Sequence, residues 1–221
     1  MDEKSKSPAR GDSTRDALLD AATLVFAREG FAAANLREIA LAAGVNAALI
    51  GYHFGGKEGL YLAVFERMTG QIRLVLDPVL ASIDQALAEP SPAKAPADRY
   101  LQPLLALVDG VLMHMLHEHP AWGELVLRET QFPGAAFELL FERVIQRNSQ
   151  AMVGLLQKLR PGDDLERVRL LAGTLISQVL CIRHYRTPFL RILRWEAIGD
   201  RELELMRTQT RRNTTLLVLG D

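Results

Sequence analysis

Two groups of side chains in this chain have the types needed for metal or nucleophilic chemistry. The stretch MHMLHEH carries His114, His117 and His119, and imidazoles are common ligands of zinc and iron. His119 directly precedes a proline and leaves the helix face shared by the other two, so we expect no metal site. Cys181 and His184 stand three positions apart on an apolar helix, but no third group orients them. Because nucleophile elbows, phosphate loops and metal motifs are also absent from the sequence, it predicts neither an enzyme nor a cofactor.

A third group lies in GVNAALIGYHFGGKEGLY, from Gly44 to Tyr61, and its chemistry suits phosphate binding. Tyr52, His53 and Lys57 place a phenol, an imidazole and an ammonium close together, and each of these groups donates hydrogen bonds to phosphate oxygens. The stretch before them has room for only about two helical turns, too few for a helix that is stable alone. Neighbouring helices must therefore hold these side chains in place.

Helical periodicity and capping residues predict those neighbours. A first helix is expected to begin at Ser13 or Thr14 and to end at Gly30. Asn35 is suited to cap a second helix that ends at Gly44, and Asn46 to cap a short third helix. The remaining helices, separated by Pro- and Gly-containing breaks, are expected at 57 onward, about 99–118, 121–131, 134–159, 164–186 and 201–218.

These helical patterns and the near absence of strand signals predict an all-α protein with about nine helices, in a chain long enough for a sizeable core. Hydrophobic residues make up 48% of the 221 positions, and the formal net charge is −1. The polar N-terminus lacks an apolar signal segment, and no apolar run approaches the ~20 residues that span a bilayer. One cysteine permits no intrachain disulfide. We therefore expect a cytoplasmic protein with no membrane partner.

Two parts of the chain resemble known regulators. The stretches TRDALLDAATLVFAREGFAAANLREIALAAGV and YHFGGKEGLY are similar to the DNA-binding domain of the TetR family of bacterial transcription regulators. Near the C-terminus, GDDLERVRLLAGTLISQVLCIRHYRTPFLRILRW and IGDRELELM resemble the C-terminal domain of CecR-type regulators in that family. Residues 1–12 are charged and lack helical periodicity, so we expect a disordered arm there. The resemblance implies a three-helix helix-turn-helix domain (13–60) and a ligand-binding and dimerisation bundle (61–221).

The function implied by the resemblance is that of a homodimeric repressor, released from a palindromic double-stranded DNA operator by an unidentified small molecule. In a helix-turn-helix domain the second helix of the motif enters the major groove. Lys4, Lys6 and Arg10 could reach an adjacent groove or form only a soluble tail. The expected DNA contacts are Thr14, Arg37, Asn46, Ala47, Ala48, Tyr52, His53 and Lys57.

Two positions depart from the family pattern and keep an alternative open. Many relatives carry Lys where this chain has Ala47, and Tyr where it has Gly51. Both differences remove potential phosphate contacts. The alternative is an all-α small-molecule-binding or adaptor protein that has lost DNA binding.

Effector and dimer residues are predicted from apolar stripes with a few polar members. The expected effector contacts are Met113, His117, Trp122, Leu125, Arg128, Glu129, Phe132, Leu180, His184 and Tyr185. The expected dimer contacts are Leu170, Leu171, Thr174, Leu175, Gln178, Val179, Ile182, Leu203 and Met206.

Overall fold

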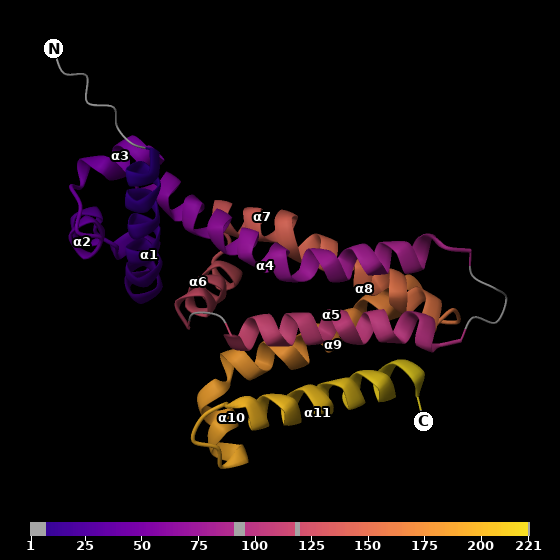
Figure 1. Ribbon diagram of the computed structural model, residues 1–221. Helices are drawn as coiled ribbons and strands as arrows, with labels where there is room; N and C mark the ends of the chain where they lie inside the picture. Colours follow the sequence, from indigo (N-terminus) through magenta and orange to yellow (C-terminus); the bar gives the residue numbers. More distant parts are fainter. Residues whose placement is uncertain (1–7, 91–95, 118–119, 221) are drawn as a thin grey trace. The chain divides into compact units, whose positions relative to one another are not determined.

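The computed structural model describes residues 8–90, 96–117 and 120–220 (Figure 1). The described residues form helices and no strand, which confirms the predicted all-α class. The elements are α1 (Pro8–Ala33), α2 (Leu36–Ala42), α3 (Ala48–Phe54), α4 (Lys57–Ala88), α5 (Asp98–His117), α6 (Pro120–Gln131), α7 (Ala135–Leu140), the π-helical turn η1 (Phe141–Ile145), α8 (Gln146–Leu159), α9 (Leu165–His184), α10 (Arg186–Leu193) and α11 (Asp200–Leu219).

The chain divides into two compact units. The first contains α1, α2, α3, the part of α4 up to Gly70, α6 and α7, whereas the second contains α4 from Gln71 onward, α5 and α8 to α11. The expected boundary near residue 60 therefore differs from the division in the structure. Sequence order alone does not reveal that α6 packs against α1.

The first unit has its own apolar core, which supports the short helices. Leu18, Leu19 and Phe26 of α1 are fully buried, as are Ile39 of α2 and Ile50 of α3. Since neither α2 nor α3 is long enough to be stable alone, burial of one apolar face holds each of them in the domain.

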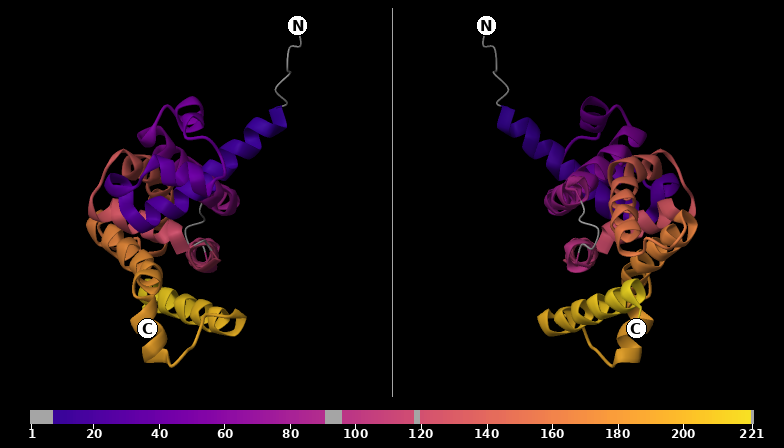
Figure 2. Two further views of the ribbon diagram at one scale, coloured as in Figure 1. Left: turned by 90° about the vertical axis from the view of Figure 1, so that its left-hand side faces the viewer. Right: turned by 90° about the vertical axis from the view of Figure 1, so that its right-hand side faces the viewer.

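The second unit is a helical bundle around α5. Buried residues recur along α5 at the spacing of one helix face, and α8, α9 and α11 pack against that helix. Figure 2 gives two side views of α9, α10 and α11, which follow one another at the C-terminal end of the chain. The buried residues of α5 include Leu101, Leu104, Leu105, Val108 and Leu112.

Three local features differ from the expected helices. The first helix begins at Pro8, before the expected start at Ser13 or Thr14, while Lys4 and Lys6 lie outside the described residues. The expected helix 134–159 contains a π-helical turn, where one residue more than usual fits into a turn. Helix α10 follows α9 almost directly, in a stretch for which the sequence predicts no separate helix.

Candidate nucleic-acid interface

The recognition helix α3 is anchored by one buried side chain and capped at its start. Ile50 is fully buried, and Val45 and Phe54 are half-buried beside it. The Asn46 side-chain oxygen accepts a hydrogen bond from the backbone N–H of Ala48 at 2.8 Å, as the capping prediction required. The Asn35 side chain caps α2 in the same way, accepting from the backbone of Arg37 at 2.9 Å.

Above these anchors, α2 and α3 present a mixture of donors and small side chains. Tyr52 is 76% exposed, and Arg37, Asn46 and Ala48 are also exposed. Ala47 is half-buried at the helix start. Because the first residues of a recognition helix meet base edges, small side chains there permit close approach to thymine methyl groups.

Tyr52 and His53 are neighbours whose rings interact edge to face. Their ring centroids are 5.0 Å apart with an interplanar angle of 81°. His53 is half-buried, so it presents less surface than Tyr52. The arrangement suits a phosphate contact by the phenol, with the imidazole orienting it from one side.

Lys57 has a structural role that its sequence position did not reveal. Its Nζ donates to the carbonyl of Ala32 at 2.9 Å and lies 5.2 Å from the centre of the Phe31 ring. An ammonium has three N–H groups, so Lys57 can hold the end of α1 and still approach a phosphate. Thr14 was expected at a helix start but lies within α1, where it is half-buried.

The junction between α3 and α4 requires a glycine at position 59. A Cβ atom added to Gly59 would lie only 1.8 Å from the carbonyl oxygen of Phe54. No real side chain tolerates that distance to a backbone atom. Gly59 thus sets the closeness with which the end of α3 packs on the start of α4, and sequence reasoning missed it.

Two other basic residues of the first unit, Arg15 and Arg28, are engaged within the protein. The Arg15 guanidinium lies 5.4 Å from the centre of the Phe54 ring. Arg28 forms ion pairs with Glu29 and Glu38, and hydrogen bonds to these two carboxylates raise the pKa of the exposed Arg28 guanidinium. Arg15, Arg28 and Lys57 therefore use part of their charge in contacts within the domain.

Comparison with known proteins identifies the two halves of the chain. A family model described as bacterial regulatory proteins, tetR family, matches residues 18–64, which include the helices α2 and α3. A second, for the C-terminal domain of the HTH-type transcriptional dual regulator CecR, matches residues 101–220, more than half of the chain. The chain belongs to the TetR family of bacterial transcriptional regulators. This confirms the family that the sequence motifs predicted.

Individual relatives span most of this TetR-family chain. CecR of Shigella flexneri is 27% identical over 213 residues, covering 96% of this chain and 94% of its own. The transcriptional regulator BetI of Rhizobium meliloti is 31% identical over 163 residues, covering 74% of each.

Solved structures with the same fold include FadR from Bacillus subtilis in complex with stearoyl-CoA. It has a TM-score of 0.59 and 15% identity, with coverage of 93% of this chain and 98% of its own. PfmR from Thermus thermophilus has a TM-score of 0.57 and 18% identity, with coverage of 92% and 97%. At such low identity these likenesses concern the fold alone.

Half of the predicted effector residues lie in the first unit, and the protein itself engages two of them. Glu129 is buried, and its carboxylate accepts hydrogen bonds from Tyr61 and from the start of α7. Arg128 Nη2 donates to the backbone carbonyl of Arg28 at 3.3 Å. Leu125 is fully buried in the core, Trp122 is half-buried and Phe132 is 80% exposed.

The other half lies in the second unit. Met113 and Leu180 are half-buried, and Tyr185 is 63% exposed. The side chains of His117 and His184 lie outside the described part of the chain, as does His119. Among the described residues, no three His, Cys, Asp or Glu side chains are grouped closely enough to hold a metal ion.

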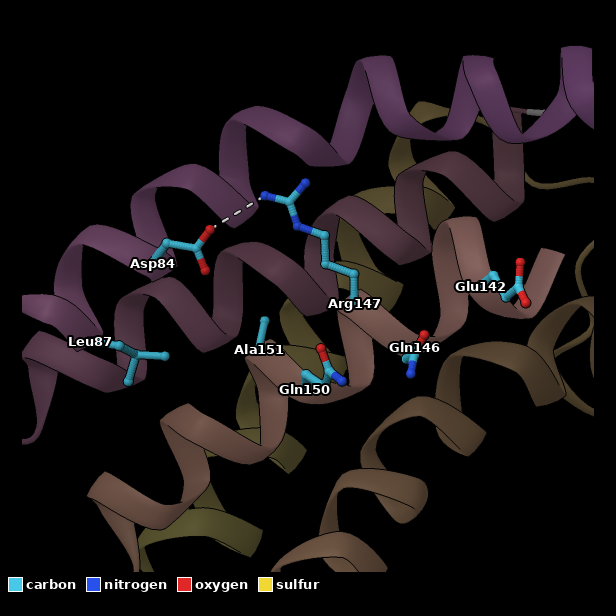
Figure 3. Close-up of a pocket in the computed structure, with 7 residues that line it drawn as sticks. All are labelled: Asp84, Leu87, Glu142, Gln146, Arg147, Gln150 and Ala151. Carbon is cyan, nitrogen blue, oxygen red and sulfur yellow. Dashed lines mark hydrogen bonds and ion pairs between the residues drawn. The ribbon is translucent and has the colours of Figure 1, made fainter. Parts of the chain in front are cut away.

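The second unit also has an open polar pocket of about 400 Å³, which none of the predicted effector residues lines (Figure 3). It lies between α4 and the η1–α8 segment. Arg147 projects across it and pairs with Asp84 at 3.3 Å and with Asp77 at 3.6 Å. Glu142, Gln146 and Gln150 supply the rest of its polar lining. Its few apolar side chains distinguish it from the enclosed pockets in which most small effectors are bound.

The predicted dimer residues belong to two different faces. Leu175, Val179, Ile182 and Met206 are buried against their own chain, so they are corrected from surface to core positions. Leu170, 72% exposed, and Thr174 face outward, whereas Leu171, Gln178 and Leu203 are half-buried. Gln178 donates to Thr214 of α11 at 3.1 Å, which ties α9 to α11 within the protomer.

No helix in the described part of the chain is long and apolar enough to cross a membrane.

Proposed function

We propose that this protein is a homodimeric repressor that leaves a palindromic operator when a small molecule binds to it. The observation that carries the proposal is the exposed set of Arg37, Asn46, Ala48 and Tyr52 on a buried three-helix core. A surface with these donors and small side chains suits a major groove. The relative named a dual regulator favours transcriptional activation as the second candidate function.

A direct test uses a DNA duplex that the wild-type protein selects from a random pool. Tyr52→Ala is expected to weaken binding to all sequences alike, whereas the salt dependence should stay nearly unchanged because the phenol is neutral. Arg37→Ala is expected to relax base preference at one position, at a cost of about 1–3 kcal/mol if it reads guanine. Selection of no duplex by the wild-type protein would favour the adaptor alternative instead.

For the dimer, we propose that the outward face of α9 around Leu170 and Thr174 packs against the same face of a second copy. Leu170→Asp would place a charge in that contact and is expected to give monomers in sedimentation at micromolar concentration. Ile192→Asp on α10 is the matched control, because Ile192 is 78% exposed but lies outside the predicted stripe. Unchanged dimers of Leu170→Asp would place the interface elsewhere.

The effector set stays a prediction, and the two tryptophans offer a way to test it. In a Trp195→Phe background, Trp122 is the only tryptophan. A compound that releases the selected duplex is expected to change Trp122 emission. A releasing compound without that effect would exclude Trp122 from the binding site.

A further inference from the structure

A buried carboxylate joins three helices of the first unit. Glu129 of α6 is only 8% exposed. Its Oε1 accepts a hydrogen bond from the Tyr61 hydroxyl of α4 at 2.8 Å. Its Oε2 accepts from the backbone N–H groups of Gly134 and Phe137, at the start of α7, at 3.2 and 3.1 Å. Both oxygens are thus used, by donors from two different elements.

The adjoining residue attaches the same helix to the end of α1. Arg128 donates to the carbonyl of Arg28 and lies against Gly30, where α1 is kinked by a positive φ of 78°. A Cβ atom at position 30 would meet Arg128 Nη1 at 3.1 Å. Two consecutive residues of α6 therefore contact α1 and α4, the helices that flank the helix-turn-helix pair in sequence.

From Tyr61 the contacts continue to the start of α4. The Tyr61 ring lies 5.0 Å from the Phe31 ring and 4.9 Å from the Phe26 ring, measured between centroids. The Lys57 ammonium lies over the Phe31 ring and donates a hydrogen bond to the carbonyl of Ala32. Lys57 is about one helical turn before Tyr61, directly after the junction with α3.

A leucine at position 129 would also pack α6 into this core, but it would not orient the Tyr61 hydroxyl or the start of α7. A buried charge costs free energy unless donors satisfy it, so the three hydrogen bonds make the positions of α4, α6 and α7 depend on one another. Removing one partner leaves the others with an unsatisfied buried group.

We propose that Glu129 is a positioning residue for DNA recognition: through Tyr61 it fixes the start of α4, and hence the recognition helix α3, in the DNA-reading arrangement. The proposal rests on the DNA recognition proposed above. It assigns Glu129 to the DNA-reading unit and not to effector contact.

The test uses full-length Tyr61→Phe, Glu129→Gln and the double variant with the duplex selected by wild-type protein. Each single variant is expected to bind that duplex about tenfold more weakly, per active molecule, while binding of sheared non-specific DNA at low salt stays unchanged. The double variant is expected to bind no more weakly than the weaker single variant, because both changes remove the same charge-assisted hydrogen bond from the Tyr61 hydroxyl to the Glu129 carboxylate. Glu124→Gln, at an exposed glutamate of the same helix, is the matched control.

A second readout separates positioning from general destabilisation. In the Trp195→Phe background, the selected duplex is expected to change the emission of Trp122, about two turns before Glu129 on α6, and Glu129→Gln is expected to remove that response. Folded variants that bind the duplex like wild type, or losses that add in the double variant, would overturn the proposal. Failure of wild-type protein to select any duplex would instead overturn DNA recognition itself. If Glu129→Gln does not fold, Tyr61→Phe, which keeps the ring, decides alone.

Discussion

The α3–α4 junction gives a sharp test of how this domain positions its recognition helix. We expect Gly59→Ala to be destabilising because its Cβ would lie 1.8 Å from the Phe54 carbonyl oxygen. Ordinary contacts between carbon and a carbonyl oxygen lie at about 3.3–3.6 Å, so that oxygen must retreat by about 1.5 Å. The atom belongs to backbone, and no flexible side chain can absorb the movement.

The magnitude follows from two opposing contributions. Overpacking of this kind costs about 1–3 kcal/mol. Replacing glycine reduces the entropy of the unfolded chain and returns about 0.4–1 kcal/mol. A backbone clash belongs at the upper end of the first range, so we expect a net loss of about 2 kcal/mol. For a chain of this size that corresponds to a fall in Tm of about 4–8 °C.

The matched control is Gly70→Ala on α4, where nothing lies within 4 Å of the added Cβ. Gly70 is exposed inside the same helix as Gly59, so alanine should stabilise the protein by about 0.5–1 kcal/mol. Thermal unfolding followed by circular dichroism and anisotropy with the selected duplex measure both effects. Only Gly59→Ala should also lose DNA affinity, because only it displaces the end of α3. Equal behaviour of the two variants would refute this account of the junction.

Three further predictions concern charge and capping. Ala47→Lys should restore a phosphate contact and strengthen DNA binding, with a salt dependence steeper by about 0.9 in log–log slope, measured by anisotropy at several salt concentrations. Burial raises the pKa of Tyr61 above its unfolded value of about 10, and the hydrogen bond to Glu129 raises it further. The stability that Tyr61 contributes through this shift is complete below about pH 10 and is lost as the pH rises further. Denaturant titrations should show that Tyr61→Phe lacks this loss. Arg99 donates to the carbonyls of Ala86 and Glu89 at the end of α4, so Arg99→Met should lower the free energy of unfolding by about 1–2 kcal/mol in the same titrations.

The helices of the DNA-binding domain could be predicted because their limits are encoded locally. Asn35 and Asn46 cap the helices that follow them, as their side-chain chemistry indicated. Gly44 and Gly55 adopt the positive φ values that end helices. Each of these signals depends on a few consecutive residues, so no knowledge of the tertiary structure was needed.

The roles of Lys57 and Glu129 could not be predicted in the same way. The sequence predicts Lys57 as a phosphate ligand, but its contact with Ala32 joins residues far apart in the sequence. It predicts Glu129 as part of an effector site, whereas the partner Tyr61 lies on another helix. One sequence signal was available: a glutamate on the same helix face as the apolar Leu125 must find donors inside the protein.

The predicted dimer stripe mixes core and surface positions for a different reason. Leu170 and Leu175 belong to one apolar helix, and their spacing alone does not reveal which of them faces the protein's own core. In the structure Leu175 is fully buried and Leu170 is 72% exposed. A helix that packs against its own bundle and against a second copy carries apolar residues on both faces, so periodicity predicts the helix but not its partners.

Charge and geometry together indicate how this regulator obtains its affinity. The first 60 residues contain seven basic and eight acidic side chains. Arg15 and Arg28 are engaged by neighbouring residues, and the Lys57 ammonium holds a backbone carbonyl. We therefore expect counterion release to contribute less here than in a strongly basic domain, with a correspondingly smaller salt dependence of binding. The direct contacts must then supply more of the affinity, and such contacts tolerate little displacement. Under the proposal made for Glu129, the tightly packed Gly59 junction and the hydrogen-bonded Glu129 carboxylate would limit such displacement of α3.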